Sequence, residues 1–499
     1  MATARVQPDI ARPARSVERW DYETDVAVIG MGGAGACAAI EACDAGADVL
    51  VFELASAPGG STALSSAELY LGGSGGTRVQ KACGYEDSSD AMYAYLCMSM
   101  GPQADTDKIR AYVDGASAHF DWLVAQGVPF RDSEYKARAM MALTDDCLLY
   151  TGSEKAWPYC DQAKPCPRGH NLEIKGDNGG PLLMKILAEA LGRRNVQVHC
   201  EARALQLITE GEGADLKVIG VVVRIDQQQR FVRARAGVVL CAGGFVMNSE
   251  MVQKYAPELA RCTIPIGNPG DTGSGIQMGL SVGAAAINMH EGFVSLPFYP
   301  PASLTYGIFV NAQGQRFINE DVYHGRAGAA VLRQPNMNAY LILSVEDYGD
   351  YETNSYLGAP VAATGESVEE LEGELNLPAG QLVNTCAFFN EHAAQGQDPL
   401  YRKSAEWLKP LKAPLVALDI SPGHGAYFPY FTLGGLDTTP SGEVRRSSGS
   451  IITGLYAAGR TACGVPRRGD GYASGMSVGD ATFSGRMAGR AAAARSKHV

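Results

Sequence analysis

The chain has 499 residues, more than one hydrophobic core usually serves, so two or more domains are expected. Hydrophobic residues make up 46% of it and 59 residues are glycine, a composition that favours a globular enzyme with many turns. The net charge of −12, without any cluster of lysine and arginine, argues against nucleic acid or an anionic membrane as a partner.

No apolar run approaches the roughly 18 residues that a transmembrane segment needs. Residues 1–20 hold arginines and prolines but no apolar signal core, so we expect a cytoplasmic protein. The twelve cysteines show neither metal nor disulfide spacing, and the histidines are scattered. We therefore expect reduced thiols and no metal site.

Residues 26–35, with the sequence VAVIGMGGAG, join a strand to a helix of small residues through a glycine turn. The apolar residues 26–29 predict a strand that is buried on both faces. Gly30 permits the tight turn, Gly32 lets the backbone approach a phosphate, and Gly35 lets the helix pack close to the strand. The positive N-terminus of this helix then faces the anion.

A second buried strand, residues 49–52, ends at Glu53, whose carboxylate is placed to accept a hydrogen bond from a ribose hydroxyl. Strand, glycines, helix, strand and acid in this order predict a dinucleotide site, and the alternative is a glycine-rich turn without a ligand. Residues 59–66, GGSTALSS, form a second loop of small residues that suits a cofactor longer than NAD. This favours FAD.

The next segments continue an α/β pattern. Apolar residues recur at helical spacing over 90–126, and Pro181 opens a helix over 182–191. A strand over 196–200 follows, and in a flavin-binding fold it lies near the adenine, with the backbone of Ala202 as a contact.

Two hairpin strands, 218–223 and 231–234, precede a buried strand within 237–245 that ends in two glycines beside the cofactor. Residues 285–429 contain more aromatics, prolines and polar loops, which indicates an inserted domain. A short strand within 455–459 returns to the first domain. The final helix begins at Ser477, so its first amides face the pyrimidine carbonyl of a flavin.

Seven motifs occur in order over nearly the whole chain: VAVIGMGGAG, FE, GGSTALSS, CAGGF, GQRFINED, FTLGGL and LYAAG. Together they resemble the fumarate reductase and succinate dehydrogenase flavoprotein superfamily. The resemblance implies an α/β fold with a Rossmann-like FAD-binding domain, whose parallel sheet carries a three-stranded antiparallel crossover, and an inserted α+β capping domain. It also implies FAD-binding parts at 1–284 and 431–499, a cap at 285–430, and an active site between them.

Fumarate reductases of this superfamily carry an arginine four residues after the glutamate of their RFVNE-type motif, where this chain has His324. Arg326 is nearby but out of register. Tyr323 directly before His324 is similar to the 3-ketosteroid dehydrogenases, and the pattern of Tyr472 followed two residues later by Ser474 resembles their Δ4-(5α) subfamily.

By that resemblance Tyr472 donates a hydrogen bond to the ketone oxygen, Ser474 takes the proton from carbon 4, and Tyr323 relays it towards solvent. FAD accepts the hydride and is held non-covalently, because neither Ser61 nor its neighbours is the histidine that tethers flavin in some relatives. The partners are then a steroid substrate and an unidentified electron acceptor. The predicted cofactor contacts are Gly30, Gly32, Gly33, Ala34, Gly35, Glu53, Gly60, Ser61, Thr62, Ser65, Ser66, Ala202, Ala242, Gly243, Gly459, Arg460, Gly475, Ser477 and Val478.

Three alternatives stay open. A 3-ketosteroid Δ1-dehydrogenase would oxidise the neighbouring bond of the same steroid ring. An enoate reductase resembling fumarate reductase would need cationic anchors for carboxylates, and a flavin- or NAD-binding sensor would bind the cofactor without any substrate bleaching it.

Overall fold

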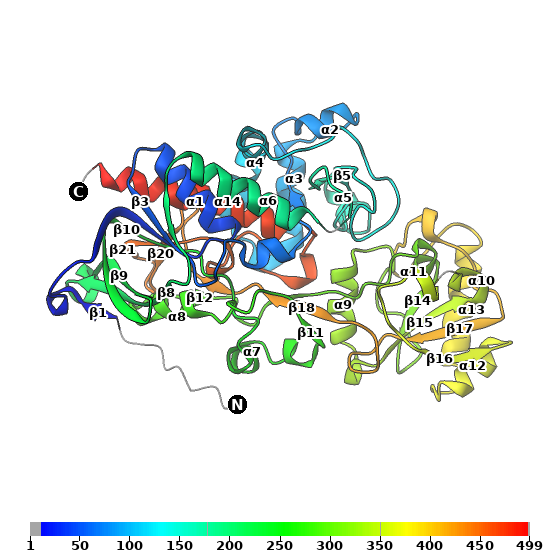
Figure 1. Ribbon diagram of the computed structural model, residues 1–499. Helices are drawn as coiled ribbons and strands as arrows, with labels where there is room; N and C mark the ends of the chain where they lie inside the picture. The colour runs from blue at the N-terminus through cyan, green and yellow to red at the C-terminus, as the bar shows by residue number, and fades with distance from the viewer. Residues whose placement is uncertain (1–10, 177, 350, 498–499) are drawn as a thin grey trace.

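The computed structural model describes residues 11–176, 178–349 and 351–497, and a nine-stranded sheet forms its larger lobe (Figure 1). Seven strands lie in the order β1 (Arg12–Pro13), β8 (Arg203–Glu210), β9 (Lys217–Ile225), β10 (Gln228–Leu240), β2 (Tyr22–Ile29), β3 (Val49–Phe52) and β7 (Gln197–His199). Strand β21 (Ile451–Ala457) also pairs with β10, and β20 (Glu443–Arg445) pairs with β21.

Strand β10 divides the sheet into a parallel and an antiparallel part. Its first half pairs antiparallel with β9, and its second half lies parallel to β2 and β21. We predicted separate strands over 231–234 and from 237, but they form one strand with a bulge between Ala234 and Gly237. Gly237 has φ +146°, and a Cβ there would lie 2.5 Å from the Gly454 carbonyl oxygen, so glycine lets the strand continue. Strands β8, β9 and β10 form the expected antiparallel crossover, and the predicted fold class is confirmed.

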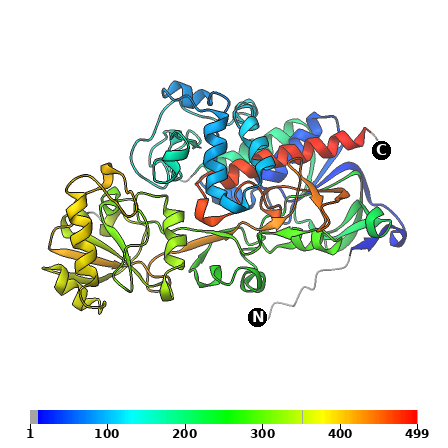
Figure 2. The same ribbon diagram turned by 180° about the vertical axis from the view of Figure 1, so that it is seen from behind.

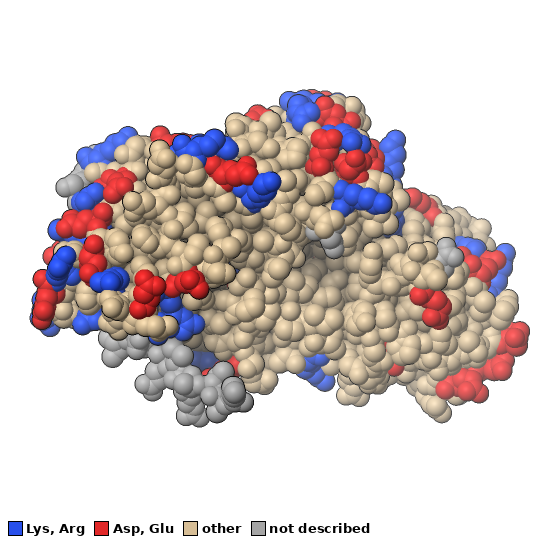
Figure 3. All heavy atoms as spheres, viewed as in Figure 1, with Lys and Arg blue, Asp and Glu red and all other residues tan. Residues whose placement is uncertain are grey.

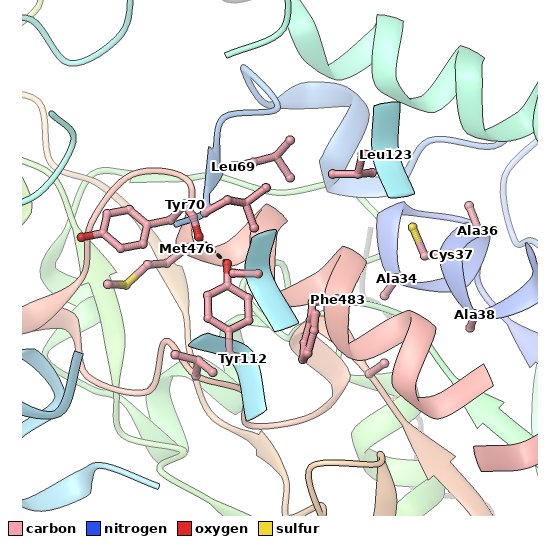
Figure 4. Close-up of a cluster of buried hydrophobic side chains, with 14 of the residues drawn as sticks. Ala34, Ala36, Cys37, Ala38, Leu69, Tyr70, Tyr112, Leu123, Met476 and Phe483 are labelled. Carbon is pink, nitrogen blue, oxygen red and sulfur yellow. Dashed lines mark hydrogen bonds between the residues drawn. The ribbon is translucent and has the colours of Figure 1, made fainter. Parts of the chain in front are cut away.

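Three helices cover one face of this sheet (Figure 1). Their bounds are α1 (Gly33–Asp44), α6 (Gly179–Arg193) and α14 (Met476–Ser496). A Cβ on Gly485 or Gly489 of α14 would lie about 2 Å from the carbonyl oxygen of Ala34 or Ala38 of α1, at 2.2 and 2.1 Å respectively. Only glycine therefore permits this close contact. Figure 4 shows Ala34, Cys37 and Ala38 of α1.

A small helical region lies beside these helices. It contains α2 (Arg78–Ala82), α3 (Ser89–Met100), α4 (Thr106–Gln126) and α5 (Tyr159–Gln162), with a short sheet of β4 (Leu69–Tyr70), β6 (Gly169–His170) and β5 (Leu148–Leu149). The helical pattern predicted over 90–126 forms two helices, α3 and α4, which a 3-10 turn containing Pro102 separates. The Tyr112 hydroxyl donates to the Tyr70 carbonyl oxygen at 2.5 Å and ties α4 to β4 (Figure 4).

The smaller lobe is built around a four-stranded antiparallel sheet. Its strands lie in the order β14 (Ile308–Asn311), β15 (Ala339–Ser344), β17 (Leu415–Asp419) and β16 (Val361–Gly365). The helices of this lobe are α9 (His324–Leu332), α10 (Val345–Tyr348), α11 (Tyr351–Asn354), α12 (Val368–Glu374) and α13 (Gln381–Ala393). A separate apolar cluster around Leu371, Leu382 and Phe389 packs α12 and α13 on the sheet.

Strand β18 (Pro429–Thr432) runs between the two lobes, as both views show (Figure 1 and Figure 2). It pairs with β13 (Gly292–Val294) and β11 (Ile264–Pro265), and β12 (Ala286–Ile287) pairs with β19 (Gly435–Leu436). These pairs bring the two ends of the insertion side by side. The boundaries at 284/285 and 430/431 stay a prediction.

Two shorter helices, α7 (Ser249–Tyr255) and α8 (Ser274–Ser281), follow β10. None of the helices in the described ranges is long and apolar enough to span a bilayer. Residues 1–10, the first half of the stretch expected to lack a signal core, lie outside those ranges.

Candidate active site

One cavity of about 1600 Å³ runs from the glycine turn after β2 to the smaller lobe, which is the cap. Figure 3 shows the surface hollowed between the two lobes, with mostly uncharged residues around the hollow. The cavity is lined by all the predicted catalytic residues and by all the predicted cofactor contacts except Gly35. The fold therefore gathers into one space residues that lie between positions 30 and 478.

Gly35 packs against the turn itself. A Cβ on Gly35 would lie 1.9 Å from the Gly30 carbonyl oxygen, so α1 can begin this close to β2 only with glycine at position 35. This contact matches the packing role that the sequence predicts for Gly35.

The phosphate end of the cavity fits a dinucleotide. Helix α1 begins at Gly33 without a side chain capping its N-terminus from Gly32, and the Gly33 amide donates to Thr62 Oγ1 at 3.1 Å. Gly33 and Ala34 of α1 line the cavity together with Gly60 and Ser61. A helix N-terminus lined by glycine backbone is suited to a pyrophosphate.

Glu53 is 7% exposed and fixed by the backbone on both sides of it. Its Oε2 accepts from the Met31 amide at 2.6 Å and its Oε1 from the Ala55 amide at 2.8 Å. The Ala202 amide donates to the Glu53 carbonyl oxygen at 2.8 Å, which places Ala202 at the same end of the cavity. Each carboxylate oxygen keeps a second lone pair for a ribose hydroxyl.

Asp271 is a residue of this site that the sequence interpretation missed. Its carboxylate accepts from Ser61 Oγ at 2.5 Å and from the Arg460 guanidinium at 2.6 Å, and Ser61 Oγ accepts from the Asn268 amide at 2.8 Å. The loop around Asp271 thus joins two predicted cofactor contacts, Ser61 and Arg460. Asp271 lies 210 positions after Ser61 and in no motif, so only the fold reveals it.

The three predicted catalytic residues meet at the far end of the cavity. The Tyr323 hydroxyl lies 2.7 Å from Ser474 Oγ, and either oxygen can donate. The Tyr472 ring centroid lies 6.5 Å from that of Tyr323. Tyr323 ends the segment before α9 of the cap, whereas Tyr472 and Ser474 lie in the loop before α14.

The hydroxyl of Tyr472 is oriented by the first turn of α14. The Ser477 amide donates to Tyr472 Oη at 3.2 Å, so that oxygen acts as acceptor and its own hydrogen is free for a substrate oxygen. The Ser477 amide is therefore already in use, and of the two amides predicted to face the flavin, that of Val478 is the better candidate. Both residues line the cavity.

Burial controls the ionisation of both tyrosines. Tyr323 and Tyr472 are 2% and 6% exposed. Burial raises the pKa of Tyr323 well above its usual value, and it also raises the pKa of Tyr472, against a smaller lowering by hydrogen bonds from Ser477. Both phenols are therefore protonated at neutral pH.

The walls around Tyr472 are aromatic. The ring centroids of Phe293 and Phe431 lie 4.6 and 5.5 Å from that of Tyr472. The other apolar residues of this half include Met140, Met141, Pro297, Tyr356 and Tyr427. The surface is suited to a flat apolar molecule with few polar groups.

Among the described lining residues, no unpaired cationic side chain lies beside Tyr472. His324 binds Ser295 Oγ through Nδ1 at 2.7 Å, and burial lowers its pKa to about 3, so the ring is neutral. Arg326 donates to the Tyr159 hydroxyl at 2.5 Å and does not line the cavity. The remaining basic lining residue near the aromatic wall, Arg460, is paired with Asp271.

Comparison with known proteins identifies the family of this chain. The family described as an FAD binding domain matches residues 25–470. The 3-ketosteroid-Δ4-(5α)-dehydrogenase of Rhodococcus jostii RHA1, solved with 4-androstene-3,17-dione, is 41% identical with a TM-score of 0.91, over 97% of this chain and 99% of that one. This confirms the predicted resemblance to that subfamily.

Two further relatives place the likeness in context. The 3-oxo-5-alpha-steroid 4-dehydrogenase of Comamonas testosteroni is 27% identical over 88% of this chain and 93% of its own length. The NADH:fumarate oxidoreductase of Klebsiella pneumoniae is 26% identical over 95% of this chain, which spans only 48% of that protein.

Proposed function

This chain belongs to the family described as FAD binding domain proteins, and on that premise we propose that it is a 3-ketosteroid Δ4-(5α)-dehydrogenase. The observation that carries the proposal is the 2.7 Å contact between Tyr323 Oη and Ser474 Oγ beside Tyr472, in an aromatic cavity. The 41% identity to the Rhodococcus enzyme supports the substrate class.

Tyr472 stabilises the ketone. Its oxygen accepts from the Ser477 amide, so its hydrogen is directed to the carbonyl oxygen at carbon 3. That bond strengthens as the α proton leaves and negative charge grows on the oxygen. When bound, FAD supplies the acceptor for the hydride from carbon 5.

Ser474 and Tyr323 move the proton. Ser474 Oγ takes the proton from carbon 4 while giving its own hydrogen to Tyr323 Oη, and Tyr323 passes its hydrogen on towards solvent. Because burial raises the pKa of Tyr323, this phenol is a relay and is not a resident tyrosinate base. The C4–H and C5–H bonds break, and a C4–C5 double bond forms.

We also propose that FAD is bound non-covalently, since residues 59–66 contain no histidine. Among the described residues that line the cavity, the one histidine is His324, which lies in the cap and away from that loop in the sequence. Acid precipitation is expected to release the yellow colour into the supernatant. All twelve cysteines are free thiols, which supports a reducing compartment such as the cytoplasm.

Anaerobic mixing with a 5α-saturated 3-ketosteroid, followed at the visible flavin band, tests the proposal. We expect bleaching that slows when deuterium replaces hydrogen at carbons 4 and 5, and we expect Ser474→Ala to abolish it while leaving steroid binding largely intact. Conversion of a Δ4-3-ketosteroid into the 1,4-diene would assign the chain to the Δ1 enzymes. Oxidation of a reduced dye by fumarate, without any steroid turnover, would assign it to the enoate reductases.

A further inference from the structure

Tyr323 and Ser474 belong to different parts of the fold, and a third segment contacts both. Tyr323 lies in the cap, and Ser474 lies in the loop before α14. Thr151 and Ser153, in the segment between β5 and α5, bind Ser474 and Tyr323 respectively. The relay contact between the two hydroxyls thus depends on how this segment holds each partner.

Thr151 holds Ser474 by two hydrogen bonds. The Ser474 amide donates to the Thr151 carbonyl oxygen at 3.0 Å, and Thr151 Oγ1 donates to the Ser474 carbonyl oxygen at 2.9 Å. Both backbone polar groups of Ser474 are therefore bound to one residue. Thr151 is 4% exposed, so these bonds are shielded from water.

Ser153 holds Tyr323 from the same segment. The Tyr323 amide donates to Ser153 Oγ at 3.1 Å, and the Ser153 amide donates to the Tyr95 hydroxyl at 3.0 Å. The carboxylate of the next residue, Glu154, accepts from the Gly152 amide and from the Tyr70 hydroxyl, each at 2.9 Å. The segment between Thr151 and Ser153 is thereby fixed to buried side chains.

Arg138 holds the cap loop that leads to Tyr323. Its guanidinium donates to the carbonyl oxygens of Asp321 at 3.1 Å and Val322 at 2.8 Å. The guanidinium carbon also lies 4.1 Å from the Tyr299 ring centroid. The two residues that precede Tyr323 are thus bound to the helical region.

We propose that Thr151, Ser153 and Arg138 are positioning residues that set the distance between Tyr323 Oη and Ser474 Oγ across the two lobes. The inference rests on the proposed function and deepens it, because it names what fixes the proton relay. Proton transfer depends steeply on geometry, and a displacement of about 1 Å far from the chemistry costs on the order of 100-fold. None of the three is among the residues that line the cavity.

Ser153→Ala, made in the wild type and in Tyr323→Phe, gives the decisive comparison. We expect Ser153→Ala to slow flavin reduction by about 10-fold or more in the wild type, with unchanged steroid Kd, and to have no further effect when the Tyr323 hydroxyl is absent. Thr151→Val is expected to act similarly and Thr151→Ser to restore the rate, since Ser keeps the hydroxyl. Ser448→Ala, an exposed change away from the cavity, is the matched control.

A second measurement does not depend on turnover. With 3-fluorotyrosine at position 323, we expect the fluorine NMR resonance to shift in Ser153→Ala and Thr151→Val but not in Ser448→Ala. An unchanged resonance, or an equal slowing by Ser153→Ala in both backgrounds, would overturn the inference. If no 3-ketosteroid reduces the flavin of the wild-type enzyme, the proposed function is refuted. The fluorine resonance at position 323 still tests the positioning role in that case.

Discussion

Tyr472→Phe tests the ketone donor because it removes one hydroxyl and keeps the ring among its aromatic neighbours. The ring centroid lies 4.6 Å from that of Phe293, so the packing that positions the side chain persists. Loss of a single donor to a developing oxyanion typically costs about 2.7–4 kcal/mol, a fall of about 10²–10³ in turnover. We therefore expect flavin reduction by a 5α-3-ketosteroid to slow by at least 100-fold.

The same substitution has a smaller effect on stability. The Ser477 amide, which is partly buried, loses its acceptor, the Tyr472 oxygen, and an unsatisfied donor costs up to about 1–3 kcal/mol. Anaerobic stopped-flow measures the rate, urea unfolding measures the stability, and bound flavin is quantified from its absorbance. Tyr456→Phe, a buried tyrosine of β21 outside the cavity, is the control. Near wild-type reduction by Tyr472→Phe, with flavin bound, would refute the assignment.

Three further predictions follow from other parts of the structure. Glu53→Ala is expected to weaken FAD binding by about 1.5–3 kcal/mol, measured by titrating apoprotein with FAD, and full affinity would contradict the ribose contact. Gly485→Ala places a Cβ 2.2 Å from the Ala34 carbonyl oxygen and is expected to destabilise the fold by about 1–3 kcal/mol in urea unfolding. The control Gly192→Ala in α6 places its Cβ where nothing lies within 4 Å and is expected to stabilise the fold slightly. Equal effects of the two substitutions would reject the packing argument. Burial lowers the pKa of His324 from 6.5 to about 3, so between these pH values the unfolded chain binds a proton that the folded chain does not. His324→Gln is therefore expected to reduce the loss of stability on acidification in that range by up to about 1.4 kcal/mol per pH unit. Parallel curves of unfolding free energy against pH for wild type and variant would contradict this.

Much of the cofactor half was predictable because its signals are local. Gly30, Gly32 and Gly35 act on a turn and a helix only a few residues away, so their spacing alone implies a strand, a turn and a helix N-terminus. Glu53 follows at the end of the next strand. The helical pattern over 90–126 did not reveal the break at Pro102, since apolar periodicity runs on both sides of it in α3 and α4.

The tertiary structure alone decided which distant residues meet. Asp271 joins Ser61 to Arg460 through contacts that no spacing in the sequence indicates. Thr151, Ser153 and Arg138 likewise carry no motif, because a residue that positions another one needs only a suitable donor or acceptor at the right place.

By itself, then, the sequence determined the flavin-binding fold and named Tyr323, Tyr472 and Ser474 through a family resemblance. It did not determine that Tyr323 Oη lies 2.7 Å from Ser474 Oγ, because these residues are 151 positions apart and belong to different lobes. The distance between these two oxygens results from the packing of the cap on the larger lobe, and hydrogen bonds between the two lobes fix that distance.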